Sequence, residues 1–428
     1  MDQRFYKVKK VKGELAFKGD KSISHRTLIF AAMASGKSKI QNLSDGLDVA
    51  ATIKCLKQIG VTIVSENDNT IVSGAGYHGF RKPESLLNCF NSGTTARLLS
   101  GLLVAQNFNS TLVGDLSLSK RPMKRVIEPL QLMGGQLSGS TNDTLPISIN
   151  PSSGLKSIRY ELNVPSAQVK SAILIAGLHI DSETNVIETS FTRDHTERLL
   201  GLNVEKIGHL VISKSSIKNY PSARDYFIPG DISSASFLII AALLIPNSEL
   251  IIRNVSLNPT RTALIELLNN MDAGIEVTTK AMLNNEKYGD LLVKSSELKN
   301  VTIPKDIVPL IIDEIPILAI AGIFAEGRFE IQHTGELRFK ESDRIKAICF
   351  NLKNAGLVIE EYEDGFSIDG KLKNSEIMFE SFGDHRIAMA CSILAMKHKY
   401  GGTINGFECV NVSNPEFLEQ INSVCEFS

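Results

Sequence analysis

The residues of this chain best suited to chemistry are cations and hydroxyls that stand directly in front of short apolar segments. Lys, Arg, Ser or Thr side chains placed there lie near the first turn of a helix, where free backbone N–H groups and the helix dipole favour an anion. This pattern predicts that several helix N-termini together bind phosphate or carboxylate groups. Six such segments occur, namely Gly-Asp-Lys-Ser-Ile-Ser-His-Arg (19–26), Asn-Ser-Gly-Thr-Thr-Ala-Arg (91–97), Pro-Ser-Ala-Gln-Val-Lys (165–170), Gly-Asp-Ile-Ser-Ser-Ala-Ser (230–236), Asp-Glu-Ile-Pro (313–316) and Gly-Asp-His-Arg (383–386).

A single segment of this kind is usually no more than an N-cap in front of a core helix. Repetition favours the functional interpretation. Between the apolar helices a second, more amphipathic helix recurs, which ends at Gly, the residue expected just after a helix, and leads into a β-branched strand. The inferred unit is β-α-β-α-β-β, with one helix buried and one exposed. The predicted amphipathic helices span residues 48–60, 121–134, 195–202, 260–274 and 342–356.

Six units divide most simply into two domains of three. We expect residues 20–228 to form one domain, and residues 1–19 and 229–428 to form the other. One seam lies near residues 226–230, where Pro and Gly precede the fourth apolar helix. The other lies near residues 17–20, because the N-terminal strand, predicted at residues 6–11, precedes the first full unit. Two strands would then join the domains as a hinge.

Composition limits the classes of partner. A net charge of −1, no Trp and 6% aromatic residues leave little material for a nucleic-acid surface, which needs clustered cations and stacking rings. The longest apolar run, residues 237–245, is too short to cross a bilayer, so no membrane contact is expected. The sequence has no coiled-coil pattern that would indicate self-association, so we expect a monomer.

The six Cys residues show neither a zinc-ligand spacing nor a disulfide frame, since no C-x-x-C pair and no suitably spaced His occur. We therefore expect no metal and a reducing, cytoplasmic location. The N-terminal residues also lack the apolar core of a signal peptide.

Five segments, in order over nearly the whole chain, resemble the signature segments of the 5-enolpyruvylshikimate-3-phosphate synthase family (3-phosphoshikimate 1-carboxyvinyltransferases). They are residues 19–26, 91–97, Leu-Ser-Lys-Arg-Pro-Met at 118–123, Lys-Glu-Ser-Asp-Arg at 340–344, and 383–386. The resemblance implies an α/β fold, a two-domain inverse α/β barrel of six βαβαββ repeats, three per domain, joined by a two-strand hinge. It also implies a transferase of the shikimate pathway, which leads to chorismate and the aromatic amino acids. Phosphoenolpyruvate and shikimate 3-phosphate would give 5-enolpyruvylshikimate 3-phosphate and phosphate, with no metal or organic cofactor.

The two substrates bring phosphate and carboxylate groups into one place, which is unfavourable unless fixed cations surround them. Arg97 is one candidate cation, and the resemblance supplies the others. It assigns shikimate 3-phosphate to Lys21, Ser22, Arg26, Ser166, Ala167, Gln168, Arg193, Asp313 and Lys340. It assigns phosphoenolpyruvate to Lys21, Gly93, Arg121, Gln168, Arg344 and Arg386.

Catalysis needs a base for the 5-hydroxyl of shikimate 3-phosphate and an acid for the methylene of phosphoenolpyruvate. The resemblance makes Asp313 the base and Glu341 the acid, with Lys21 near the transferring groups. Asp313 could instead be only a helix N-cap, and Glu341 only an i,i+3 surface partner of Arg344. Glu341 lies between two cations that favour its ionised form, so we expect it to act as an acid chiefly in the liganded enzyme.

Some residues depart from the usual family pattern. Leu98 stands where many members have Pro, and Val412 stands where some have a Lys that binds phosphoenolpyruvate. Residues 166–168 and 192–195 resemble the branch noted for glyphosate tolerance, whereas Gly93 is typical of sensitive members.

Two alternatives remain open at this stage. The sister enzyme, UDP-N-acetylglucosamine enolpyruvyl transferase, usually has a reactive Cys on the loop that corresponds to residues 117–123, and this loop has no thiol. A non-catalytic protein that binds anions or RNA could use the same repeats, although the net charge and the low aromatic content weigh against it.

Overall fold

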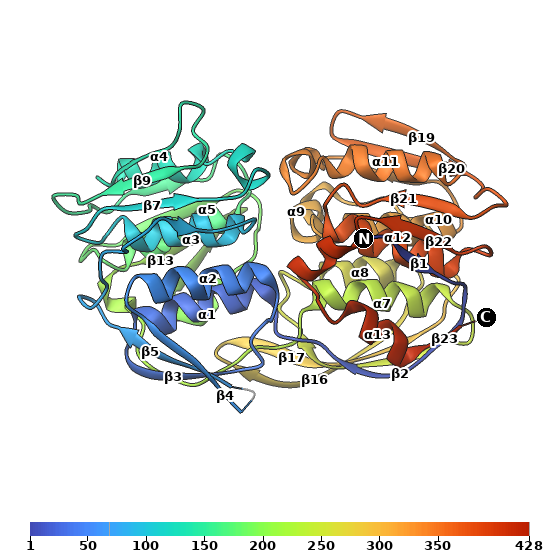
Figure 1. The fold of residues 1–428 in the computed structure, drawn as a ribbon, viewed down its shortest axis with the longest axis horizontal. Helices are drawn as coiled ribbons and strands as arrows, with labels where there is room; N and C mark the ends of the chain where they lie inside the picture. The colour runs from blue at the N-terminus through green and yellow to red at the C-terminus, as the bar shows by residue number, and fades with distance from the viewer. Residues whose placement is uncertain (68, 428) are drawn as a thin grey trace. The chain divides into compact units, whose positions relative to one another are not determined.

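The structure, a computed structural model, describes residues 1–67 and 69–427 and divides the chain into two compact units (Figure 1). The N-terminal unit comprises Gly19–Ile228 and Met282–Glu286. The C-terminal unit comprises Met1–Lys18, Pro229–Ala281 and Lys287–Ser428. The chain therefore passes from one unit to the other after Lys18 and after Ile228, and crosses again on either side of Met282–Glu286.

The segment Met282–Glu286 belongs to the N-terminal unit, although the predicted division placed it in the other domain with the rest of 229–428. It is the tip of the hairpin formed by β16 (Gly274–Leu283) and β17 (Glu286–Lys294). The tip is anchored by Asn285, whose Nδ2 donates to the Arg198 carbonyl at 2.9 Å, and by Glu286, whose Oε1 lies 2.7 Å from Nδ1 of buried His195. These contacts are long-range in sequence, so no local pattern predicts them.

Three buried helices form the core of the N-terminal unit: α1 (Lys21–Met33), α3 (Gly93–Leu103) and α5 (Ala167–Gly177). Most of their side chains are apolar or small, as expected for helices that are surrounded by protein. Gly101 of α3 lets α5 come close, because a Cβ there would lie 2.3 Å from the Ala172 carbonyl oxygen. Asp20, Ser92 and Ser166 cap these helices through their side chains, as the polar openings predicted.

Among the described residues of the N-terminal unit, the strands form three four-stranded sheets with one pattern, a parallel first pair followed by two antiparallel pairs. The amphipathic helices α2 (Leu47–Gln58), α4 (Lys124–Leu132) and α6 (His195–Leu200) precede the hairpin of each sheet. The strand order of the first sheet is β14 (Tyr226–Phe227), β3 (Ser35–Gln41), β5 (Asn69–Ala75), β4 (Thr62–Glu66). The order of the second is β6 (Leu87–Asn88), β7 (Ser110–Val113), β9 (Ile147–Asn150), β8 (Gln136–Ser138). The order of the third is β10 (Arg159–Glu161), β11 (Thr184–Glu188), β13 (Leu210–Ser215), β12 (Asn203–Ile207).

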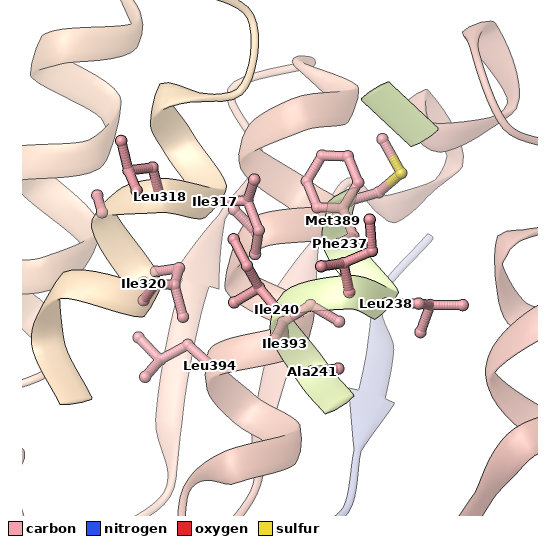
Figure 2. Packing of buried hydrophobic residues seen from close by; sticks show 14 of the residues in the cluster. Phe237, Leu238, Ile240, Ala241, Ile317, Leu318, Ile320, Met389, Ile393 and Leu394 are labelled. Atoms are coloured by element: carbon pink, nitrogen blue, oxygen red, sulfur yellow. The ribbon is translucent and has the colours of Figure 1, made fainter. Parts of the chain in front are cut away.

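The C-terminal unit is also built around three buried helices, α7 (Ile232–Leu244), α10 (Ile315–Phe324) and α12 (His385–Lys397). Figure 2 shows Phe237 and Ile240 of α7 packed beside Ile317 of α10 and Met389 of α12. Asp231 and Asp384 cap α7 and α12 through their side chains. Both units therefore present polar helix openings on an apolar three-helix core.

The strands of the C-terminal unit include two from the N-terminal residues. The sheets run β16, β17, β15 (Glu249–Ser256), β2 (Val8–Ala16), β23 (Cys425–Phe427); β18 (Phe329–Ile331), β20 (Gly365–Gly370), β19 (Leu357–Tyr362); and β1 (Gln3–Phe5), β22 (Gly402–Asn405), β21 (Ile377–Glu380). The remaining helices are α8 (Ala263–Asn270), α9 (Val308–Ile311), α11 (Arg344–Asn354) and α13 (Phe417–Val424).

The predicted bounds of several elements need correction. The N-terminal strand expected at residues 6–11 corresponds to β2, which begins at Val8 and extends to Ala16, and β1 before the exposed Tyr6 was not predicted. The two strands pair in different sheets. The helices expected from 121, 260 and 342 begin later, at Lys124, Ala263 and Arg344, because short 3-10 turns or loops precede them. The α/β class itself is confirmed.

Within the described residues no single helix is long and apolar enough to cross a membrane. One pair, Lys305–Ile311 with Ile315–Phe324, reaches that length and composition only together, and it is bent by 116°.

Candidate active site

Lys21 and Ser22 form the first turn of α1 in the N-terminal unit. Asp20 caps this helix by accepting from the Ile23 N–H at 2.9 Å, and Lys21 Nζ lies 3.0 Å from Oδ2 of Asp48, in the first turn of α2. Asp48 was not among the predicted site residues. Lys21 is thus a partly buried ammonium at a helix N-terminus, oriented by a neighbouring carboxylate.

Arg26 lies one turn further along α1 and is buried. Its Nε donates to Thr196 Oγ1 at 2.8 Å, its Nη2 donates to Ser171 Oγ at 2.8 Å, and its Nη1 donates to the Ser22 carbonyl at 2.9 Å. Burial lowers the pKa of the guanidinium to about 10. The structure therefore places Arg26 beneath the helix openings, where it fastens α1 to α5 and α6.

The N-termini of α3 and α5 are linked by side chains. Arg97 Nη1 donates to Gln168 Oε1 at 2.7 Å, and Gln168 Nε2 donates to Thr94 Oγ1 at 2.9 Å. Ser166 caps α5, and Ala167 is the first residue of that helix. The amide of Gln168 is consequently held in one orientation between α3 and α5.

Gly93, the first residue of α3, lies between two guanidinium groups. A Cβ at this position would be 2.7 Å from Arg97 Nη1 and 3.5 Å from Arg121 Nη1. Arg121 itself donates through Nη2 to Asn91 Oδ1 at 2.6 Å and to Ser117 Oγ at 3.3 Å. The missing side chain of Gly93 therefore leaves room beside two cations.

In the C-terminal unit Arg344, the first residue of α11, collects three carboxylates. Its Nη1 donates to Asp313 Oδ1 at 3.2 Å and its Nη2 donates to Glu341 Oε2 at 2.5 Å. Its Nε donates to Asp384 Oδ2 at 2.8 Å. The side chain is 1% exposed, yet the pKa of Arg344 is raised because these carboxylates outweigh the burial that opposes its charge.

The same cluster fixes Asp384 and Lys340. Asp384 caps α12 by accepting from the Arg386 N–H at 2.9 Å, and it also accepts from Ser342 Oγ at 3.1 Å. Burial alone would raise the pKa of Asp384, but the attraction of Arg344 outweighs burial and lowers it. Lys340 Nζ lies 3.4 Å from Asp313 Oδ1, so two cations face that carboxylate.

The N-cap position of α10 is occupied by Glu314, without a side-chain hydrogen bond, and Asp313 stands one residue before it. Arg386, in the first turn of α12, donates through Nη1 to the Asp313 carbonyl at 2.9 Å and to Ser233 Oγ at 2.7 Å. The openings of α7, α10 and α12 are thereby joined.

Residues 5–421 match the family model described as EPSP synthase (3-phosphoshikimate 1-carboxyvinyltransferase). The chain belongs to the EPSP synthase family. A 3-phosphoshikimate 1-carboxyvinyltransferase of Petrotoga mobilis is 48% identical over 416 residues, 96% of each chain. Another, of Pelobacter propionicus, is 44% identical over 412 residues, 95% of each chain. A solved EPSP synthase from Acinetobacter baumannii matches with a TM-score of 0.86 at 40% identity, covering 99% of this chain and 98% of that one.

The family resemblance inferred from the five segments is confirmed, and with it the enolpyruvyltransferase fold. The comparisons support this interpretation and not the UDP-N-acetylglucosamine alternative. Among the described residues, no group of three or more His, Cys, Asp or Glu side chains has the arrangement of a metal site.

Each unit gathers its own share of the predicted residues. The openings of α1, α3 and α5 bring together Lys21, Ser22, Gly93, Arg97, Ser166, Ala167 and Gln168, with Arg26 beneath them and Arg121 beside Gly93. Arg344 gathers Asp313, Lys340 and Glu341, and Arg386 contacts the same Asp313 through its carbonyl.

Sequence reasoning missed the buried cluster that supports Arg193. Lys170 Nζ lies 2.7 Å from both Glu188 Oε2 and Glu197 Oε1, and Thr192 donates to Glu188. Burial raises the pKa of Glu188 despite Lys170, whereas the two carboxylates raise the pKa of Lys170 against burial. The cluster fixes the loop before α6. Lys170 lies in the predicted helix opening 165–170, but no local sequence pattern points to its partners Glu188 and Glu197.

Proposed function

We propose that this protein transfers the enolpyruvyl group of phosphoenolpyruvate to the 5-hydroxyl of shikimate 3-phosphate and releases phosphate. The observation that carries the proposal is the Arg344 cluster, in which one buried guanidinium binds both candidate proton carriers, Asp313 at 3.2 Å and Glu341 at 2.5 Å. It occurs in a chain 48% identical to a relative named for this reaction.

The cations of both units would balance the negative charge of the substrates, which together carry roughly six negative charges near neutral pH. We assign the phosphate of shikimate 3-phosphate to the hydroxyls and helix-terminal N–H groups at Ser22 and Ser166, with Lys21, Gln168 and Arg193. Arg26 contributes from beneath by fixing Ser22 and Ala167, whose carbonyls accept its N–H groups at 2.9 and 3.4 Å. Lys340 and Asp313 complete this set.

Phosphoenolpyruvate would bind where Arg side chains can form forked hydrogen bonds with carboxylate or phosphate oxygens. We assign it to Arg121, Arg344 and Arg386, with Lys21 and Gln168 shared between the two substrates. Gly93 leaves the space beside Arg121 open, since a Cβ would lie 3.5 Å from its Nη1.

The chemistry needs two proton transfers. Asp313 accepts the proton of the 5-hydroxyl as the oxygen attacks C2 of phosphoenolpyruvate, and Glu341 donates a proton to the methylene carbon, giving a tetrahedral intermediate. In the second step Glu341 takes a proton from the new methyl group and Asp313 gives its proton to the departing phosphate oxygen. The bond between C2 and that oxygen breaks, phosphate leaves, and the enol ether of the product forms. The carboxylate of phosphoenolpyruvate would replace Glu341 at Arg344, so Glu341 becomes able to hold a proton only in the liganded enzyme.

Phosphate release tests the function directly. Purified enzyme with phosphoenolpyruvate and shikimate 3-phosphate should release phosphate and form the enol ether, while UDP-N-acetylglucosamine in place of shikimate 3-phosphate should give none. Unphosphorylated shikimate serves as the matched control for the phosphate-binding residues. Release with the nucleotide sugar alone, or with neither acceptor, would overturn the proposal.

We also propose that the two domains, residues 20–228 and residues 1–19 with 229–428, act on the same substrate pair and close on it through their two connecting strands. Shikimate 3-phosphate contacting both would drive closure and favour the second ligand. Small-angle X-ray scattering should then give a smaller radius of gyration with ligand, and an unchanged radius would contradict closure.

The same proposal includes a monomer in the cytoplasm that binds neither nucleic acid nor membrane. Its support is the net charge of −1 and six cysteines that are all free thiols. Light scattering of the purified enzyme gives the mass, and retention on an RNA column at low salt would contradict the nucleic-acid part.

A further inference from the structure

We infer that Ser233 and Glu314 are positioning residues that aim Arg386 at phosphoenolpyruvate through a buried hydrogen-bond relay. Neither residue belongs to the sets assigned above. The inference rests on the proposed function, because Arg386 matters there as a ligand of phosphoenolpyruvate. All four groups of the relay, including Arg261, lie in the C-terminal unit.

The relay begins at the first turn of α7. Arg386 Nη1 donates to Ser233 Oγ at 2.7 Å, and Ser233 Oγ in turn donates to Glu314 Oε1. The Ser233 hydroxyl has one proton, which it donates to the Glu314 carboxyl oxygen, so only its lone pairs remain to accept from Arg386. The Glu314 carboxyl oxygen thereby sets the direction of the Ser233 hydroxyl, and that hydroxyl accepts from the guanidinium.

Glu314 is itself held in place. It is 3% exposed, its Oε1 lies 3.5 Å from Arg261 Nη1 and 3.8 Å from Arg386 Nη1, and it directly follows Asp313 in the chain. A buried carboxylate is tolerated when cations and hydrogen-bond donors surround it. Ser233, 1% exposed, and Arg261, 3% exposed, are equally enclosed, so the relay has little freedom to change its geometry.

Both hydrogen bonds that the Arg386 side chain donates come from one nitrogen, Nη1. Nη1 donates to Ser233 Oγ and to the Asp313 carbonyl at 2.9 Å, which uses both of its protons. Among residues 1–67 and 69–427, the structure gives no hydrogen bond to Nε or Nη2 of Arg386. A planar guanidinium fixed at Nη1 presents Nε and Nη2 as a fork, the edge that binds two oxygens of a carboxylate or phosphate. The relay therefore fixes the plane in which the ligand is bound.

Ser233→Ala tests the relay with the smallest change. We expect the KM for phosphoenolpyruvate to rise roughly tenfold, with kcat and the KM for shikimate 3-phosphate changed by less than about threefold, since only the aim of Arg386 is lost. Ser392→Ala is the matched control, because Ser392 is an equally buried serine of α12 whose Oγ donates only to the Ala388 carbonyl. Glu314→Gln should raise the same KM, and Ser233→Thr should restore it.

A double-mutant comparison separates positioning from a general structural role. In an Arg386→Lys background, Ser233→Ala should no longer raise the KM for phosphoenolpyruvate, since the group it aims is gone. A similar rise in both backgrounds, a parallel rise in both KM values, or an unchanged KM with a lowered Tm would each overturn the inference.

Failure of the proposed function gives a different result. If wild-type enzyme releases no phosphate with shikimate 3-phosphate, the function fails, and the relay is then judged from crystal structures of wild type and Ser233→Ala. A guanidinium plane of Arg386 that turns in the variant supports the relay, and an unmoved plane overturns it.

Discussion

Arg26 and Arg344, one buried arginine in each unit, are held in contrasting ways. In the N-terminal unit the hydrogen bonds of Arg26 end on hydroxyl and peptide oxygens, which are neutral. In the C-terminal unit Arg344 is bound by the carboxylates of Asp313, Glu341 and Asp384. Each unit also contains the opposite case, since Arg198 pairs with Asp194 in the N-terminal unit and Arg386 donates to Ser233 and to the Asp313 carbonyl in the C-terminal unit.

The difference follows from what each kind of partner does to charge. Neutral oxygens orient a guanidinium and leave its positive charge to attract an anion, which suits phosphate binding. Carboxylates cancel the charge but supply groups that can exchange protons. The surroundings of Arg26 thus favour the binding of an anion nearby, and the carboxylates at Arg344 favour acid and base chemistry.

The largest expected effect concerns the carboxylates. Glu341→Gln removes the proposed proton donor while keeping a similar shape, and the single-turnover rate should fall by roughly 10²- to 10⁴-fold with a small change in phosphoenolpyruvate affinity. Glu330→Gln, an exposed glutamate of β18 hydrogen-bonded to Gln332, is the control. If the pH profile of the Glu341 variant matched that of the wild type, the acid assignment would be wrong.

The second prediction compares the two kinds of arginine environment through stability. Arg344→Met leaves three carboxylates without their shared cation, one of them fully buried, and should lower the free energy of unfolding by about 3–5 kcal/mol. Arg26→Met removes hydrogen bonds to neutral partners and should cost less, about 1–3 kcal/mol. Calorimetry or urea denaturation followed by circular dichroism measures the free energy of unfolding of both variants. Equal losses would contradict the difference between the two arginine environments.

Gly93→Ala tests the space between Arg97 and Arg121 in the N-terminal unit. The new Cβ would lie 2.7 Å from Arg97 Nη1, so this flexible guanidinium must shift away from Gln168. We expect roughly a tenfold higher KM for phosphoenolpyruvate with little change in Tm. Gly335→Ala is the control, because φ at Gly335 is not positive and a Cβ there would lie 3.7 Å from the Asp364 Cβ, an ordinary contact. A normal KM in the Gly93 variant would show that the space is not used.

The smallest effect is in the pH dependence of stability. Burial, followed by the charges of Lys21 and Arg26, holds the pKa of His25 well below its ordinary 6.5, against the opposing effect of Asp20. The unfolded chain therefore binds the proton more readily, and the N-terminal unit loses stability as the pH falls through 6.5. Burial lowers the pKa of His179 to about 4, which acts in the same direction. In the C-terminal unit, the lowered pKa of Asp384 contributes stability that is lost only below its ordinary value of 3.8.

Hydrogen exchange at pH 7.0 and 5.5, corrected for intrinsic rates, measures this difference by unit. Peptides of the N-terminal unit should lose protection first, and His25→Gln, which keeps a side-chain partner for Thr52, should reduce the loss. Equal loss in both units, or no change in the variant, would contradict the assignment.

Local patterns predicted much of this fold. The openings at residues 19–26, 91–97, 165–170, 230–236 and 383–386 all begin buried helices, because a capping side chain and an apolar run act within a few residues. Strand bounds were less well predicted, since β1 and β2 are separated by the different sheets they join, and that pairing is not local.

Partners of charged residues were the part that sequence could not supply. The family resemblance assigned Arg26 to shikimate 3-phosphate, but it gave no sign that Thr196 and Ser171, more than a hundred residues away, enclose this side chain. Ser233 and Arg386 meet across 153 residues, and the hairpin tip at Glu286 meets His195 across 91.

The sequence by itself determined where the polar helix openings lie and to which family their order belongs, because capping, helix propensity and segment order are all written along the chain. Only the tertiary structure decided which charges neutralise one another, which arginine is buried and which guanidinium edge remains for a ligand. The physical reason is that charge pairing acts over a few ångströms in space, and packing of the three-helix cores sets those distances independently of separation along the chain.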